Sequence, residues 1–137
     1  MKNFLFLSIL FLGLGLTSCK DDEMHNHDNN AEYNVTVTIV SPEGDSTHAL
    51  NEAVHIHITM VHEHLETIHN ALIQVKNAED EVVMTLLDDH IHEEDGDYEF
   101  HSMDFVPDVA GTYTINAMTT NHDGALPQHA HAEFTVE

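Results

Sequence analysis

After residue 32, apolar and polar residues alternate along most of the chain. Tyr33, Val35, Val37 and Ile39, for example, are separated by single polar residues. Successive side chains of a β-strand point to opposite faces, so this period of two predicts strands with one buried face. Six further segments have alternating or apolar patterns between turn residues: 54–60, 71–75, 82–87, 98–105, 113–117 and 130–136. The sequence therefore predicts an all-β fold, an antiparallel β-sandwich of about seven strands over residues 32–137, with an acidic loop at 88–96.

The start of the chain predicts export. Lys2 precedes an almost wholly apolar run at 4–16, which is shorter than the ~20 residues of a transmembrane helix and is typical of a signal peptide. The sequence Leu16-Thr17-Ser18-Cys19 resembles the lipobox of bacterial lipoproteins. That resemblance implies a lipoprotein signal peptide at 1–18 and acyl chains, palmitate among them, on Cys19. A plain signal peptide with a chance cysteine is the alternative.

The residues after this cysteine refine the expected location. Residues 20–23 are a lysine followed by three acids, which resembles the export signal of Bacteroidota surface lipoproteins. The resemblance implies an outer-membrane lipoprotein that faces outward from the cell. Residues 19–31 have no apolar pattern, so the lipidated cysteine and the acidic stretch behind it are expected to form a flexible tether.

The charge balance excludes several classes of partner. The chain has 25 Asp and Glu against 3 Lys and Arg, a formal net charge of −22. Nucleic acids and anionic membrane surfaces are both bound through clustered basic residues, which this chain lacks. Membrane contact is therefore expected only through the lipid on Cys19. With one cysteine in the chain, an intrachain disulfide is excluded.

One stretch resembles a known family of folds. Residues 108–115, DVAGTYTI, resemble the D-x-A-G-x-Y-x-C signature of immunoglobulin domains, with Ile115 in place of the cysteine. The resemblance implies a bacterial Ig-like module in which Tyr113 is buried and its hydroxyl bonds backbone within 107–110. The order of Ala71 and Val75, then DGDYEF at 95–100, then AGTYTI at 110–115 also resembles the YtkA-like family of small exported sandwiches, over roughly residues 50–120. This resemblance informs the fold more than the function.

Histidine is the residue type that most needs a functional explanation. The chain has 14 histidines, and ten of them form five His-x-His pairs, at 25/27, 55/57, 62/64, 90/92 and 129/131. Residues i and i+2 of a strand share a face, so two imidazoles so placed can converge on one metal ion. A polar face that happens to use histidine is the alternative. Imidazole with carboxylate neighbours suits Zn²⁺, Cu²⁺ or Ni²⁺, and the sequence does not choose among them.

The expected topology gathers most of these histidines at one end of the sandwich. We call this end the loop pole; its predicted metal ligands are His62, His64, His69, His90, His92, His122, His129 and His131. A smaller, secondary group is expected on the outer face of the opposite sheet, with His55 and His57 on one strand and His101 on its neighbour.

No catalytic motif accompanies the histidines. The stretch His62-Glu63-His64 is not the H-E-x-x-H of zinc proteases, and the sequence has no G-x-S-x-G elbow or glycine-rich phosphate loop. We therefore expect a non-enzyme. Two functions remain open: a cell-surface lipoprotein that binds a divalent transition metal through clustered histidines, or a non-catalytic adhesion module that binds a protein or glycan.

Overall fold

The structure is a computed structural model that describes residues 34–62, 68–93, 97–121 and 127–137, all of them within one compact unit, Ala31–Glu137. The strands are β1 (Val35–Ser41), β2 (Thr47–His48), β3 (Ile56–His62), β4 (Ile68–Asn77), β5 (Val82–Glu93), β6 (Tyr98–Ser102), β7 (Gly111–Thr120) and β8 (Gln128–Val136). Across these ranges, the structure contains no helix with the length and apolarity needed to cross a membrane. The signal peptide and the tether predicted at 1–31 lie outside the described residues.

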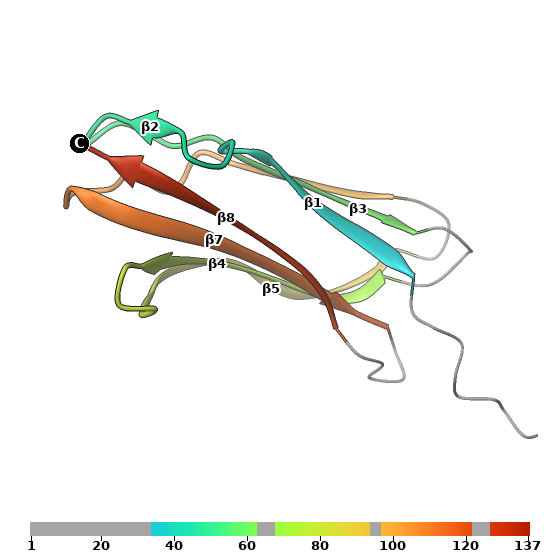
Figure 1. Ribbon diagram of the computed structural model, residues 1–137. Coiled ribbons are helices and arrows are strands. Elements are labelled where there is room, and N and C mark those ends of the chain that lie inside the picture. Colours follow the sequence, from blue (N-terminus) through green and yellow to red (C-terminus); the bar gives the residue numbers. More distant parts are fainter. Residues whose placement is uncertain (1–33, 63–67, 94–96, 122–126) are drawn as a thin grey trace, which may run out of the picture. The chain divides into compact units, whose positions relative to one another are not determined.

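The strands form two sheets that face each other (Figure 1). One sheet has three strands in the order β1-β3-β6, and the other has five in the order β2-β8-β7-β4-β5. Every pairing is antiparallel except the short parallel contact of β2 with β8. This order is that of an Ig-like sandwich. The all-β, Ig-like fold predicted from the alternation is thus confirmed.

The core lies between the two sheets and consists of the apolar positions of the alternating pattern. On β3 the buried side chains are those of Ile56, Ile58 and Met60, whereas His57 and Thr59 between them lie on the other face. The facing sheet contributes its own alternate residues, Ala71, Ile73, Val75, Tyr113, Ile115, Ala117, Phe134 and Val136. His57 is therefore outward-facing because Ile56, Ile58 and Met60 fill the core.

Tyr113 anchors the turn before β7. Its ring is buried against Phe105 and Phe134, and its hydroxyl donates a 2.8 Å hydrogen bond to the carbonyl oxygen of Val109. Burial and the charge of Asp108 together raise the pKa of the phenol above its usual value of 10.0. The Ig resemblance implied a buried Tyr113 whose hydroxyl bonds backbone within 107–110, an arrangement known as a tyrosine corner. That prediction is confirmed.

Three features of the strands differ from the expectation. The strand expected at 98–105 is shorter, because β6 ends at Ser102, where its pairing with β3 ends. The prediction of an acidic loop at 88–96 is wrong for residues 88–93, because β5 continues to Glu93 and pairs with β4 as far as Ile68. Leu87 and Ile91 of β5 pack against the core, so this edge strand has an apolar face despite its acids. The two-residue strand β2 was not predicted; its backbone pairs with β8, and a pairing so short leaves no periodic signal.

Candidate metal centre

Three potential metal ligands meet on the outer face of the β1-β3-β6 sheet. His57 of β3 lies directly opposite His101 of β6, and Thr59 lies opposite Glu99. Residues that are paired across strands, and residues two apart on one strand, share a face. The pairing therefore brings His57, Glu99 and His101 together, and we call these three residues the β3–β6 cluster.

The distances within the cluster are those of a compact ligand set. The Nε2 atom of His57 lies 2.7 Å from Oε1 of Glu99, and Nε2 of His101 lies 3.2 Å from the same oxygen. The two imidazole rings are stacked, with centroids 4.0 Å apart and planes inclined by 20°. One potential ligand atom from each residue lies within 4.8 Å of the other two. For bonds of ~2.0–2.1 Å in a tetrahedral site, neighbouring donors are about 3.3 Å apart, so a small shift of the side chains could accommodate a metal ion.

Hydrogen bonds from the imidazoles hold Glu99 in its ionised form. The bond from His57, and then that from His101, lower the pKa of this carboxyl below its usual value of 4.5. Glu99 is exposed, with 58 % of its side chain accessible, and His101 is similarly open at 52 %, whereas His57 is more covered at 19 %. The cluster thus offers an ionised carboxylate and two imidazoles at the protein surface.

His55 extends the cluster from the other side of His101. Its Nε2 atom lies 3.3 Å from Nδ1 of His101, and the two rings are nearly parallel, with centroids 5.5 Å apart. His55 does not belong to the group of close ligand atoms, which contains only one nitrogen of His101. A histidine that binds a metal through one nitrogen usually donates the hydrogen on its other nitrogen to a neighbour, which fixes its orientation. His55 is placed to be that neighbour.

The donor set determines what the β3–β6 cluster can do chemically. Two imidazoles and a carboxylate suit Zn²⁺, Cu²⁺ or Ni²⁺ better than Ca²⁺ or Mg²⁺, which prefer oxygen ligands. Among the described His, Cys, Asp and Glu residues, these are the three whose ligand atoms converge. The cluster is also supported by two paired strands rather than by a loop, so the sheet fixes the backbone positions of its three residues.

The loop pole is only partly described. The ends of β4, β5, β7 and β8 do meet there, with Ile68 opposite Glu93, Asn70 opposite Thr120, and Thr119 opposite Gln128. His64 and His122 lie outside the described residues, as does the side chain of His92. The sequence placed His90 and His92 in a loop, but both belong to β5. A metal site at the loop pole therefore stays a prediction.

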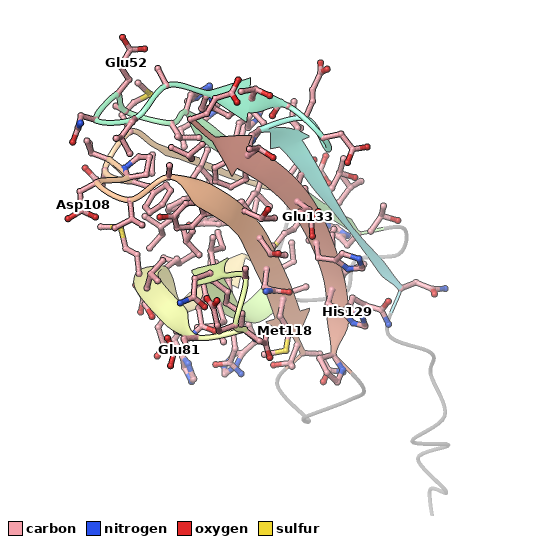
Figure 2. The ribbon with its side chains drawn as sticks, turned by 60° about the vertical axis from the view of Figure 1, so that its left-hand side comes forward. Glu52, Glu81, Asp108, Met118, His129 and Glu133 are labelled. Carbon is pink, nitrogen blue, oxygen red and sulfur yellow. The ribbon has the colours of Figure 1, made fainter. Side chains whose placement is uncertain are left out.

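The pole histidines that are described do not form a group of three. His69 is buried at the start of β4, and its ring lies 4.2 Å from that of His90, centroid to centroid. Both ring nitrogens of His62 are buried and have no hydrogen-bond partner among the described residues. His129 and His131 are exposed on β8, opposite Met118 and Asn116. Figure 2 shows His129 near the start of β8, at the end of the sandwich remote from Asp108.

Glu99 is the cluster residue that the sequence analysis did not select. Glu99 lies in the strand expected at 98–105, and β6 does contain it, but the ligands sought on this face were histidines. Glu99 stands two residues before His101, which is the same spacing as that of the His-x-His pairs. A search for any two metal-binding residue types two positions apart on one strand, and not for histidine pairs alone, would have found Glu99 with His101.

Comparisons with known proteins give distant structural similarity. No family model matches the chain, and no curated protein matches it. Among solved structures, a CARDB domain from Pyrococcus furiosus, in complex with di-metal ions, is 15 % identical, with a TM-score of 0.49 over 78 % of this chain and 90 % of that chain.

Two larger bacterial chains are similar over part of their length. Fibronectin(III)-like modules of CbhA from Clostridium thermocellum are 18 % identical, with a TM-score of 0.48 over 77 % of this chain and 47 % of that chain. The sporulation control protein Spo0M of Bacillus subtilis is 12 % identical, with a TM-score of 0.47 over 77 % and 49 %. This chain thus spans about half the length of these two. Similarity at this distance assigns no role to any residue.

Proposed function

We propose that this protein is a non-catalytic, lipid-anchored domain that binds a divalent transition metal at the β3–β6 cluster. The observation that supports this most directly is the convergence of His57, Glu99 and His101, with two Nε2 atoms facing one carboxylate oxygen at 2.7 and 3.2 Å. The site that the sequence ranked second therefore becomes the first candidate. The metal is Zn²⁺, Cu²⁺ or Ni²⁺, each of which suits this donor set.

The surroundings of the cluster favour capture of an ion from solution. The net charge of −22 attracts cations to the surface and raises their local concentration. Glu99 and His101 are exposed, so an ion reaches the cluster without opening the fold. A pair of exposed imidazoles that does not converge with a carboxylate would be a weaker ligand set, and His129 and His131 on β8, which are not part of a converging group among the described residues, provide such a pair for comparison.

Removal of matched pairs of histidines tests the metal site. We expect His57→Asn with His101→Asn to abolish the tightest binding of Zn²⁺, Cu²⁺ or Ni²⁺ measured by calorimetry near neutral pH. The control, His129→Asn with His131→Asn, removes the same number of strand histidines and should retain it. Circular dichroism checks that both variants fold. Equal losses in the two variants would indicate diffuse surface binding, and full binding in the cluster variant would shift the site to the loop pole.

The proposed location rests on the start of the sequence. We infer that Cys19 carries the lipid, that 1–18 is removed, and that residues 20–23 direct the protein to the outer surface of a Bacteroidota-type outer membrane. An exported, YtkA-like sandwich agrees with the Ig-like fold. This arrangement would place the metal-binding face outside the cell, where it meets ions from the medium.

Adhesion to a protein or a glycan remains the alternative function. The two functions are distinguished by chelation: a metal-binding protein binds ions stoichiometrically without a partner, whereas an adhesion module retains its partner after the chelator EDTA has removed all divalent ions. The measurement is binding to cells or glycan arrays with and without EDTA. If adhesion is strong and insensitive to EDTA while no stoichiometric ion binding is found, the adhesion function replaces the one proposed.

A further inference from the structure

The β3–β6 cluster provides fewer donors than a closed metal site needs. We infer, on the basis of the proposed function, that a metal held here keeps an open coordination position and takes a neutral nitrogen donor, such as the imidazole of free histidine, from solution. Closed structural zinc sites have four protein ligands, whereas sites with three protein ligands bind water or another ligand at the fourth position. Within the described ranges, the cluster has three converging residues.

His55 is the nearest further imidazole, but it faces the wrong nitrogen of His101. Its Nε2 atom lies 3.3 Å from Nδ1 of His101, while Nε2 of His101 faces Glu99 at 3.2 Å. The two nitrogens of an imidazole ring point away from each other. An ion bound to Nε2 of His101 therefore lies on the side of the ring away from His55. In this arrangement His55 orients His101 and does not complete the coordination of the ion.

The neighbours of the cluster on the side of β1 are poor donors for these metals. Thr59 lies opposite Glu99 and also opposite Thr38 of β1, and Ser41 lies opposite His57. The Ser41 hydroxyl already donates a 2.8 Å hydrogen bond to the carbonyl oxygen of His55. Neutral hydroxyl groups are not among the usual ligands of Zn²⁺ or Cu²⁺ in proteins. These hydroxyl side chains beside the cluster therefore leave one coordination position of the ion to solvent.

Charge and ligand preference together indicate which external donor fits. At long range, the net charge of −22 on the chain opposes the approach of a second carboxylate but not that of a neutral donor. Imidazole is neutral when it binds and is a preferred ligand of Zn²⁺, Cu²⁺ and Ni²⁺. The exposure of Glu99 and His101, 58 % and 52 %, leaves room for such a ring at the surface.

The test uses the purified protein in detergent, loaded with one equivalent of Cu²⁺, and titrated with imidazole or with acetate. We expect imidazole to shift the visible absorption band of Cu²⁺ to higher energy, with saturation at one imidazole per ion. Acetate at the same concentrations should produce a smaller shift or none. Absence of Cu²⁺ binding at the cluster would overturn both this inference and the proposed function. Cu²⁺ binding without any response to imidazole would overturn the inference alone.

One substitution should close the open position. Thr59→His places an imidazole opposite Glu99 and two residues from His57 on the same face. We expect this variant to bind Cu²⁺ more tightly and to lose the response to imidazole. The control Thr38→His, one strand further from Glu99, should retain the response. If Thr59→His responds like the wild type, or if loaded wild-type protein sediments as a dimer that supplies the missing donor, the inference is wrong.

Discussion

Tyr113 joins the turn before β7 to the core through a single hydroxyl group. The hydroxyl donates to Val109 at 2.8 Å while the ring packs on Phe105 and Phe134. We expect Tyr113→Phe to lower the free energy of unfolding by about 1 kcal/mol, because it removes one net hydrogen bond and keeps the ring. The midpoint of urea unfolding measures this. An unchanged midpoint would mean that the corner does not contribute to stability.

The raised pKa of Tyr113 also predicts how stability changes at alkaline pH. A group whose pKa is higher in the folded state than in the unfolded state stabilises the fold below the unfolded value, here about 10.0. That contribution is lost as the pH rises through the folded pKa. We expect wild-type protein to lose more stability above pH 10 than Tyr113→Phe does. Unfolding curves from pH 8 to 11 give the difference, and Asp108→Asn should reduce it, because the Asp108 charge contributes to the shift.

At the residue scale, the sequence predicted local contacts of a side chain better than contacts between residues far apart in the chain. The D-x-A-G-x-Y pattern was enough to predict the bond of Tyr113, because donor and acceptor are four residues apart. Glu99 was missed even though His101, two residues later, was predicted to lie on the strand next to His57, because the pattern that was followed was the pairing of histidines. Acidic residues are also so frequent here that one more carries little information.

At the element scale, the β3–β6 pair is the part of the sandwich that a bound metal should stabilise. β6 has five residues and lies at the edge of its sheet, where it pairs with β3 alone. An ion held by His57 on β3 and by Glu99 and His101 on β6 would link the two strands. By mass action, binding stabilises the fold by about 2.7 kcal/mol when free metal exceeds its dissociation constant about a hundredfold.

We therefore expect Zn²⁺ to slow amide hydrogen exchange in β6. The measurement is exchange monitored by mass spectrometry or NMR with and without Zn²⁺, and the protected region should include Tyr98–Ser102 and the paired part of β3. Exchange in β7 and β8 serves as the internal reference. The variant with His57→Asn and His101→Asn should show no slowing in β6. If Zn²⁺ slowed amide exchange uniformly in all strands of that variant as well, Zn²⁺ would be acting elsewhere on the protein.

The strands themselves were predictable because alternation depends on burial of one face, which is a local property of the sequence. β3 illustrates this, with Ile56, Ile58 and Met60 buried and His57 outward. Extension of β5 to Glu93 was not predictable in the same way, because its acids resemble a solvated loop. The backbone of β4 as far as Ile68 provides the hydrogen bonds that keep this stretch extended, and such pairing is a non-local property.

At the scale of the whole molecule, the proposed metal site and the proposed anchor are chemically independent. The metal ligands are side chains of the sandwich, whereas the anchor depends on Cys19 and the residues around it. The net charge of −22 adds a third, long-range effect, because it repels anionic membrane surfaces. The lipid is therefore expected to be the sole attachment to the membrane, with the acidic domain held away from it.

This separation makes the anchor testable without disturbing the domain. Burial of acyl chains contributes about 0.8 kcal/mol per CH₂ group, so several chains on Cys19 give effectively permanent attachment. We expect Cys19→Ala to move the protein from the membrane fraction to the soluble fraction of the cell. Replacement of Asp21, Asp22 and Glu23 by Ala should instead leave it membrane-bound and protected from a protease added to intact cells, because only the surface signal is removed. Protein that stays in the membrane fraction after Cys19→Ala would overturn the lipid anchor, and equal protease sensitivity of the acid variant and the wild type would overturn the surface signal.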